Sequence, residues 1–369
     1  MIFQRNTPGH PRSLDQHLRQ GAPNNLDFVR IFAAFLVLFG HSFTLLWSNP
    51  QNVFPHDPIS ARILHNLPFK EGLPGIGVHI FFFISGLLVT RSFFNHKNRV
   101  FSFIKARLLR ILPAYVACLF VIALLAGPLL TNIGFYEYLK SAELREFLKF
   151  NLTFTGLSTL PGVFVGNPFG QAVNGSLWTI PYELQLYGWV LILGLLTILK
   201  RKGIFSILFG YVLLAYCGSG YSNMFLNMEV ARLWILFFLG VAAAVYADKL
   251  ILSPLALLAF FVMLALTWKS GNPWFDVIGS ALFGYAILVF SFAKYIKFID
   301  VGRIGDYSYG VYLYAFPVQQ SLIYFFKSSI NAWQLVLYTA TITLALAAAS
   351  WHAIEKPALK LKSSPRPAS

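Results

Sequence analysis

Long apolar runs constrain the fold of this chain more than any other feature of its sequence. Hydrophobic residues make up 57% of the 369 residues and charged residues only 12%, whereas soluble domains usually carry about 25% charged residues. A helix needs roughly 20 apolar residues to cross the hydrocarbon core of a bilayer, and runs of that length recur along the sequence. The composition excludes a disordered chain and predicts an all-α, polytopic integral membrane protein.

Ten stretches have the length and hydropathy of membrane spans. They are residues 26–47, 74–92, 104–127, 176–199, 203–221, 229–247, 253–269, 273–293, 307–327 and 332–353. We expect one transmembrane domain over 26–355, with a basic tail at 1–25 and a second tail at 356–369. The first 25 residues lack the short apolar core and small-residue cleavage site of a signal peptide.

The distribution of Lys and Arg predicts the orientation. With ten spans and a cytoplasmic N-terminus, 20 of the 29 basic residues fall on the inner side and seven on the outer side. Cytoplasmic loops carry such an excess, so both termini are expected in the cytoplasm. The net charge of +15 is explained by this topology and needs no nucleic-acid partner. Cys118 and Cys217 lie in apolar runs without paired spacing, so neither a disulfide framework nor a metal site is indicated.

The outer segment 128–175 contains a charged stretch with helical spacing. Over residues 137–149, Leu144, Phe147 and Leu148 fall opposite the charged side chains. The pattern predicts an amphipathic helix lying in the outer interface of the membrane. It would serve either as a structural cover or as a lid over a bound acceptor.

The first span places two polar groups on one helix face. Arg30 and His41 are eleven residues apart, which is close to three full turns and about 16 Å along the axis. A charge in the hydrocarbon region costs at least about 2.5 kcal/mol and usually marks function. We interpret the pair as an inner cation and an outer base that serve substrates from opposite sides. The alternative is a snorkelling Arg and a His bonded to a neighbouring helix.

Two further spans carry charged residues. Arg107 and Arg110 are three residues apart and so share a helix face, where guanidinium forks suit phosphate oxygens or anchor the chain at lipid headgroups. Glu183 is expected at the depth of His41, where its carboxylate would orient the imidazole. It is equally placed to pair with Arg232 of the sixth span.

Six motifs, in order over residues 25–357, resemble the acyltransferase-3 family of membrane acyltransferases, which O-acylate sugars of envelope polysaccharides and related glycans. They are Asn25-Leu-Asp27-Phe-Val-Arg30 with His41, Gly77-Val-His-Ile-Phe-Phe-Phe-Ile-Ser85-Gly86, Arg107-x-x-Arg110, Ser176-Leu-Trp-Thr-Ile-Pro-Tyr-Glu183, Gly305-Asp-Tyr-Ser-Tyr-Gly-Val-Tyr-Leu-Tyr314 and Ile354-Glu355-Lys-Pro357.

The resemblance implies a donor and an acceptor on opposite sides of a bilayer, the inner membrane of a bacterium. Acyl-CoA, with acetyl-CoA the expected form, would enter from the cytoplasm as co-substrate, with no bound cofactor and no metal. A glycan or lipid-linked saccharide would be the acceptor. By this resemblance Arg30, Arg107 and Arg110 hold the CoA phosphates and His41 is the catalytic base.

The remaining candidate residues take supporting roles. Ser85 and Gly86 are small enough to line the path of the pantetheine arm, and Glu183 is the expected orienting partner of His41. Ser85 or Tyr307 would donate to the developing oxyanion. Arg232, Tyr307 and Ser176 are acceptor-side or structural polar groups.

One position departs from the family pattern. Many relatives have His where this chain has Ala315, directly after Tyr312-Leu-Tyr314. This difference bears on acceptor specificity more than on the chemistry.

The sequence therefore predicts an O-acyltransferase that moves an acyl group to a sugar hydroxyl, directly or through an acyl-histidine. A transporter or flippase for a small solute or lipid-linked glycan is the alternative from another class, and a non-catalytic scaffold is a third. Many transporters show inverted repeats and broken helices, which we do not find in this sequence.

Overall fold

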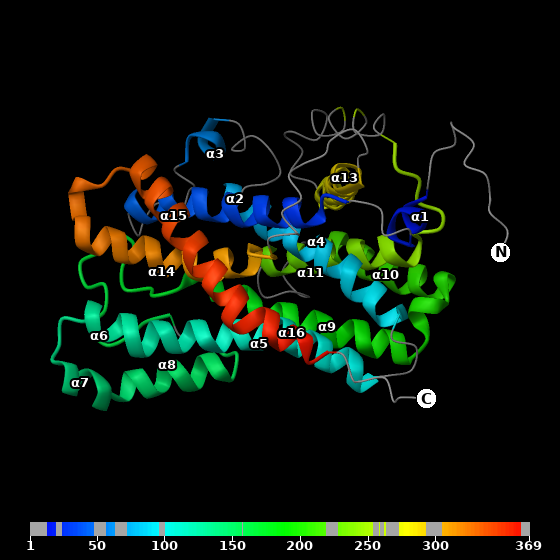
Figure 1. Ribbon diagram of the computed structural model, residues 1–369. Helices are drawn as coiled ribbons and strands as arrows, with labels where there is room; N and C mark the ends of the chain where they lie inside the picture. The colour runs from blue at the N-terminus through cyan, green and yellow to red at the C-terminus, as the bar shows by residue number, and fades with distance from the viewer. Residues whose placement is uncertain are drawn as a thin grey trace.

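The computed structural model describes residues 13–19, 24–47, 57–62, 72–95, 100–156, 158–218, 228–253, 258, 262, 273–292 and 305–362. Throughout these residues the regular elements are helices, and none is a strand (Figure 1). The elements are α1 (Leu14–Arg19), α2 (Leu26–Trp47), α3 (Pro58–Arg62), α4 (Gly72–Asn95), α5 (Val100–Phe120), η2 (Val121–Ala126), α6 (Gly127–Leu130), α7 (Phe135–Lys140), α8 (Ala142–Leu152), η3 (Gly175–Thr179), α9 (Ile180–Leu195), η4 (Ile198–Lys200), α10 (Lys202–Gly218), α11 (Met228–Val245), α13 (Pro273–Phe292), α14 (Ser308–Phe326), η6 (Lys327–Ser329), α15 (Ala332–Ser350), η7 (Trp351–Glu355) and α16 (Lys356–Lys360).

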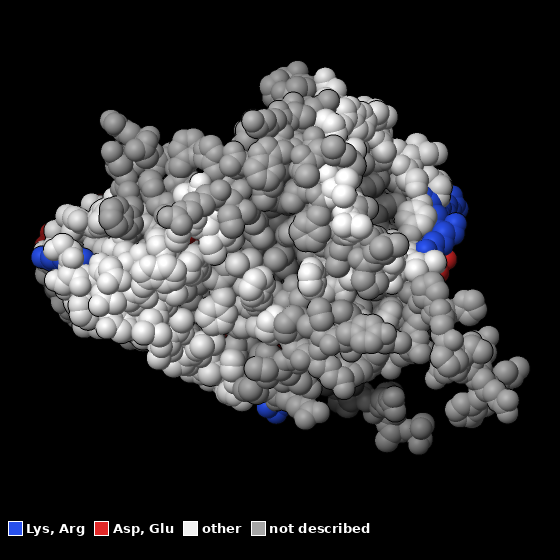
Figure 2. Space-filling view, turned by 90° about the horizontal axis from the view of Figure 1, so that it is seen from above, with Lys and Arg blue, Asp and Glu red and all other residues white. Residues whose placement is uncertain are grey.

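Five helical segments of the described part are long and apolar enough to cross a membrane: Leu26–Leu46, Gly72–Asn95, Val100–Leu130, Trp274–Phe292 and Ala332–Lys360. This confirms an all-helical protein of membrane type. In Figure 2 most of the visible charged side chains gather at the two ends of the long axis. The count of ten spans and the orientation of the termini stay predictions, and the span expected at 253–269 lies almost wholly outside the described residues.

Helix α4 lies at the centre of the bundle. It packs between α2 and α11, while α14 packs against α2 and α15. Small residues allow these close approaches: a Cβ at Gly77 would lie 2.4 Å from the Ala33 carbonyl oxygen of α2, and a Cβ at Gly240 of α11 would lie 2.1 Å from the Phe83 carbonyl oxygen. Helices α2, α4 and α11 are therefore held in close backbone contact.

Gly86 of α4 serves this packing. The side of Gly86 on which other residues carry a Cβ faces α11, and a Cβ there would lie 2.0 Å from the Phe237 carbonyl oxygen. Gly86 therefore serves the contact between α4 and α11, and its expected place on an acyl-CoA path stays a prediction.

Gly86→Ala is expected to lower the free energy of unfolding by about 1–3 kcal/mol, because an added methyl group overpacks a helix contact. Gly188→Ala in α9 is the matched control, since a Cβ there meets no atom within 4 Å and Ala favours a helix over Gly by up to about 1 kcal/mol. Denaturant unfolding in detergent micelles measures both. Equal stability of the two variants would contradict the close α4–α11 contact.

The outer segment 128–175 forms the predicted amphipathic helix, α8, which runs alongside a helix of the bundle. In α8, Leu144 and Phe147 are buried and the charged side chains are exposed. The Tyr138 hydroxyl donates to the Ala123 carbonyl at 2.7 Å, and the Tyr115 hydroxyl donates to the Asn151 carbonyl at 2.9 Å. Since Tyr115 and Ala123 lie two turns apart on the continuous α5–η2 helix, α8 runs alongside α5 (Figure 1). Its position in the outer interface of the membrane stays a prediction.

The C-terminal segment is part of the bundle. Helix α15 continues through η7 into α16, which packs against α5. Residues 356–362, assigned from the sequence to a tail, thus lie beside the helix that carries Arg107 and Arg110.

Candidate active site

A cavity of about 310 Å³ collects the basic residues that the sequence singled out. Arg30 of α2 and Arg107 and Arg110 of α5 line it together with Lys362, which follows α16. Arg107 and Arg110 reach it from one face of their helix because they are three residues apart. The rest of the wall combines apolar side chains of α4 with polar side chains of α9 and α14, so one compartment joins a cationic part to an apolar part.

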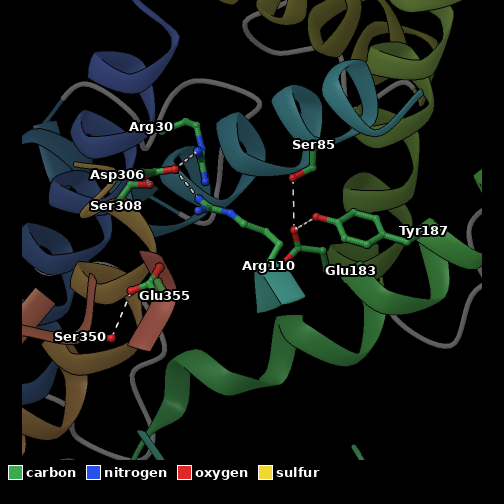
Figure 3. A network of polar contacts seen from close by, with 9 residues as sticks. All are labelled: Arg30, Ser85, Arg110, Glu183, Tyr187, Asp306, Ser308, Ser350 and Glu355. Atoms are coloured by element: carbon green, nitrogen blue, oxygen red, sulfur yellow. Dashed lines mark hydrogen bonds and ion pairs between the residues drawn. The ribbon is translucent and has the colours of Figure 1, made fainter. Parts of the chain in front are cut away.

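Arg30 and Arg110 share one counter-ion. Both guanidinium groups form ion pairs with Oδ2 of Asp306, directly ahead of α14, and the Ser308 hydroxyl donates to Oδ1 at 2.5 Å (Figure 3). Burial raises the pKa of Asp306, but the two guanidinium groups and the Ser308 hydroxyl outweigh it and hold that pKa well below its usual range. Sequence reasoning gave Asp306 no role.

Arg107 differs from the other two arginines. One of its terminal nitrogens donates to the Ser92 hydroxyl at 3.2 Å, while its buried Nε has no hydrogen-bond partner in the described structure. An unsatisfied buried donor is costly and calls for an explanation. Here it leaves a guanidinium with unused donor capacity at the wall of a cationic cavity.

A second buried carboxylate lies close to this network. Glu355, held in the π-helical turn η7, accepts a hydrogen bond from the Ser350 hydroxyl at 3.1 Å (Figure 3). Its Oε2 is buried and has no partner among the described residues. π-Helical turns occur often at functional sites.

Glu183 lies in the cavity rather than beside His41. Its Oε1 accepts hydrogen bonds from the Tyr187 hydroxyl, one turn along α9, and from the Ser85 hydroxyl of α4 at 3.2 Å (Figure 3). Neither of the two predicted partners, His41 and Arg232, forms a hydrogen bond or ion pair with Glu183 among the described residues. Arg232 instead pairs with Asp276 at 3.2 Å. The spacing of Glu183 and Tyr187 is the helical four-residue spacing that brings side chains together, and it was available in the sequence.

His41 lies eleven residues along α2 from Arg30 and is not among the residues that line the cavity. Its ring meets Phe316 edge-on at 5.4 Å between centroids, and its buried Nδ1 has no hydrogen-bond partner within the described residues. Phe81 and Tyr312 both line the cavity, and their rings meet edge-on at 5.7 Å. The structure therefore separates the two predicted groups of α2: Arg30 lines the cavity and His41 does not.

The other predicted residues divide between the cavity and its surroundings. Ser85 lines the cavity, but its hydroxyl is engaged by Glu183. The Ser176 hydroxyl is buried and has no hydrogen-bond partner among the described residues, and the Ser176 carbonyl accepts from the Tyr312 hydroxyl at 2.9 Å. Tyr307 meets His352 at 3.3 Å and does not line the cavity.

Ala315 lies in an apolar cluster between α2 and α14. It packs with Leu38 of α2 and Val311 of α14.

Comparison with known proteins identifies the family. Residues 24–352 match the acyltransferase-3 family, described as an acyltransferase domain. The chain is 30% identical over 363 residues to nodulation protein 10 of Rhizobium leguminosarum bv. viciae, which covers 93% of this chain and 95% of the relative. It is 28% identical over 356 residues to an O-acetyl transferase of Shigella phage Sf6, covering 93% and 98%. No solved structure matches it significantly. The chain therefore belongs to the acyltransferase-3 family, and the protein is an acyltransferase.

Proposed function

We propose that the protein moves an acetyl group from cytoplasmic acetyl-CoA to a sugar hydroxyl of an envelope glycan, across the inner membrane of a bacterium. The observation that carries this proposal is the cavity in which Arg30, Arg107, Arg110 and Lys362 surround one compartment. Four cations at one end and apolar side chains at the other suit a polyphosphate joined to a long, uncharged arm. The phage relative, an O-acetyl transferase, supports acetyl as the group.

The donor enters the cavity with its phosphates at the basic residues. Arg107 offers its unsatisfied Nε, and guanidinium forks bind phosphate oxygens in bidentate fashion. Arg30 and Arg110 exchange part of their contact with Asp306 for phosphate. The pantetheine arm then follows the apolar wall formed by Phe82, which is nearly fully buried, towards Phe81.

The reaction takes place where the thioester meets the sugar hydroxyl, and His41 acts as the base. The imidazole takes the proton of the sugar hydroxyl, and that oxygen attacks the thioester carbonyl. The thiolate of CoA leaves and receives the proton from the imidazolium, so that an ester and free CoA result. Such proton transfer contributes about 10²–10⁴ in rate. Because His41 does not line the cavity, side chains between the cavity and His41 must move when the thioester reaches the imidazole.

Thiol release in liposomes tests the proposal. Purified protein is reconstituted with acetyl-CoA on one side and, on the other, envelope glycan from which esters have been removed with mild base. We expect free CoA thiol and new glycan ester in equal amounts. Movement of a solute or lipid-linked glycan without thiol release would show a transporter, and neither signal would show a non-catalytic scaffold.

Lys362 gives the donor site a pH dependence. Partial burial at the cavity, together with the guanidinium groups of Arg107 and Arg110, lowers the pKa of Lys362 to about 8. The side chain is charged below this pH and loses its charge above it. We expect the KM for acetyl-CoA to rise by up to about fivefold between pH 7 and pH 9, the effect of one exposed ion pair.

Lys362→Met should remove this rise and show the higher KM already at pH 7. Lys356→Met, an exposed lysine of α16 that does not line the cavity, should keep the rise. An unchanged pH profile in Lys362→Met would contradict a phosphate contact at this residue.

A further inference from the structure

A second and larger hollow lies at the opposite end of α2 from Arg30. It has a volume of about 980 Å³ and is lined by Leu46 of α2, residues 165–168, and residues of the α14–η6–α15 turn. Leu46 is 16 residues beyond Arg30 on the same helix, which is about 24 Å along the axis. We propose that this outer cleft, a term we keep for these lining residues, binds the oligosaccharide acceptor. The inference rests on the proposed function and adds the acceptor site to it.

Hydrogen bonds fix the floor of the outer cleft. The Asn167 side-chain amide donates to the backbone carbonyl and to Oε1 of Gln320, both at 2.9 Å. The Gln320 amide in turn donates to the carbonyls of Gly170 at 3.1 Å and Ala172 at 2.8 Å. These bonds tie the 165–172 loop to α14. A pre-formed site lowers the ordering cost of binding.

Asn167 leaves one polar atom for a ligand. The residue is only 9% exposed and lines the outer cleft. Both of its hydrogen bonds use the amide nitrogen, so Oδ1 has no partner among the described residues. An amide oxygen accepts two hydrogen bonds, which matches the hydroxyl groups of a sugar.

Aromatic rings supply the complementary apolar surface. Tyr324 is held in place by Phe164, with ring centroids 6.2 Å apart, and the neighbouring Phe325 is 65% exposed. Both line the outer cleft. A sugar ring presents C–H groups on its faces and hydroxyl groups at its rim, so it matches a site where rings lie beside amide and hydroxyl groups.

Charge narrows the class of saccharide. Lys327 is the one charged side chain among the described lining residues, and none of those residues carries a carboxylate. The outer cleft therefore suits a neutral or acidic glycan and disfavours a cationic, amino-sugar polymer. Its volume, about three times that of the inner cavity, leaves room for several sugar units.

The outer cleft also lies beside the proposed base. His41 is five residues before Leu46, about 7.5 Å deeper along α2. Phe169, one residue past the cleft-lining Pro168, meets Phe316 at 5.8 Å, and Phe316 meets His41 at 5.4 Å. A glycan seated in the outer cleft would thus present one sugar unit towards the imidazole.

Two adjacent phenylalanines provide the test. Phe325 lines the outer cleft, whereas Phe326 does not and lies against Tyr338 at 6.3 Å. The acceptor probe is envelope glycan purified from the producing cell and freed of esters. We expect Phe325→Ala to raise the KM for this glycan about tenfold, as for loss of one aromatic contact in a binding site, with the KM for acetyl-CoA unchanged. Phe326→Ala should leave both values as in the parent.

A blocking experiment gives a second measurement. In a Cys217→Ser background, Ser328→Cys labelled with a bulky maleimide should lose transfer to glycan and retain binding of radiolabelled acetyl-CoA. Unchanged glycan KM in Phe325→Ala, or full transfer by the labelled protein, would overturn the assignment of the outer cleft. If the parent forms no ester from acetyl-CoA at all, the proposed function fails instead, and the two failures are therefore distinguishable.

Discussion

His41→Ala is expected to lower the rate of acetyl transfer by about 10²–10⁴, the contribution of a positioned general base. His41 is a polar group within a helix long and apolar enough to cross a membrane, and its buried Nδ1 has no hydrogen-bond partner among the described residues. An unsatisfied buried group costs stability, so removal of this imidazole should not unfold the protein. The rate of ester formation at saturating acetyl-CoA and glycan measures the effect.

His352→Ala serves as the matched control. This histidine lies in η7 and meets the Tyr307 hydroxyl, outside the cavity lining. It should transfer acetyl at the rate of the parent. If His41→Ala is also fully active, the base has been assigned to the wrong residue.

Asp306→Asn is expected to reduce the free energy of unfolding by about 3–5 kcal/mol, the usual cost of removing one partner of a buried ion pair. The substitution keeps the size of the side chain but leaves the guanidinium groups of Arg30 and Arg110 without their common counter-ion. Because the pKa of Asp306 is held below its ordinary value, the carboxylate contributes its full stability at neutral pH and loses it only in acid.

Coenzyme A should partly rescue this variant. Its phosphates would supply the missing negative charge, and a ligand that binds only the folded state stabilises it. We therefore expect added CoA to raise the stability of Asp306→Asn more than that of the parent. Denaturant unfolding with and without CoA measures the difference.

Asp248→Asn is the control for this experiment. Asp248 pairs with Lys202 at 2.5 Å, with the Asp248 side chain exposed and the Lys202 side chain partly exposed, so the loss should be below about 1 kcal/mol and independent of CoA. Equal losses for Asp306→Asn and Asp248→Asn, or no extra gain from CoA, would contradict the shared counter-ion.

The fold class followed from the sequence because apolar runs of span length report a local property. The packing of the helices against one another could not be predicted from the sequence, because it depends on contacts between residues that are far apart in the chain. Gly86 illustrates the difference: a small residue in a helix fits a ligand path and a helix contact equally well, and only the position of Phe237 decides for packing. Helix α8 illustrates the same point. Its sequence pattern predicted which face is buried, whereas its direction alongside α5 depends on the hydrogen bonds of Tyr115 to Asn151 in α8 and of Tyr138, in the preceding α7, to Ala123.

The candidate site was predictable where residues share one helix. Arg107 and Arg110 reach the same cavity because of their spacing. Asp306 was missed because it lies 276 residues from Arg30 and 196 from Arg110, and no local spacing relates it to either. Expected depth alone suggested the pairing of Glu183 with His41, but depth does not determine which helices are neighbours.

The most direct test of the account is a cryo-electron microscopy structure of the protein in a lipid nanodisc with acetyl-CoA. We predict density for the CoA phosphates at Arg107, Arg110 and Lys362, and for the arm along Phe82, with the thioester end beside Phe81. Density for CoA anywhere else on the protein, with this cavity left empty, would contradict the central claim.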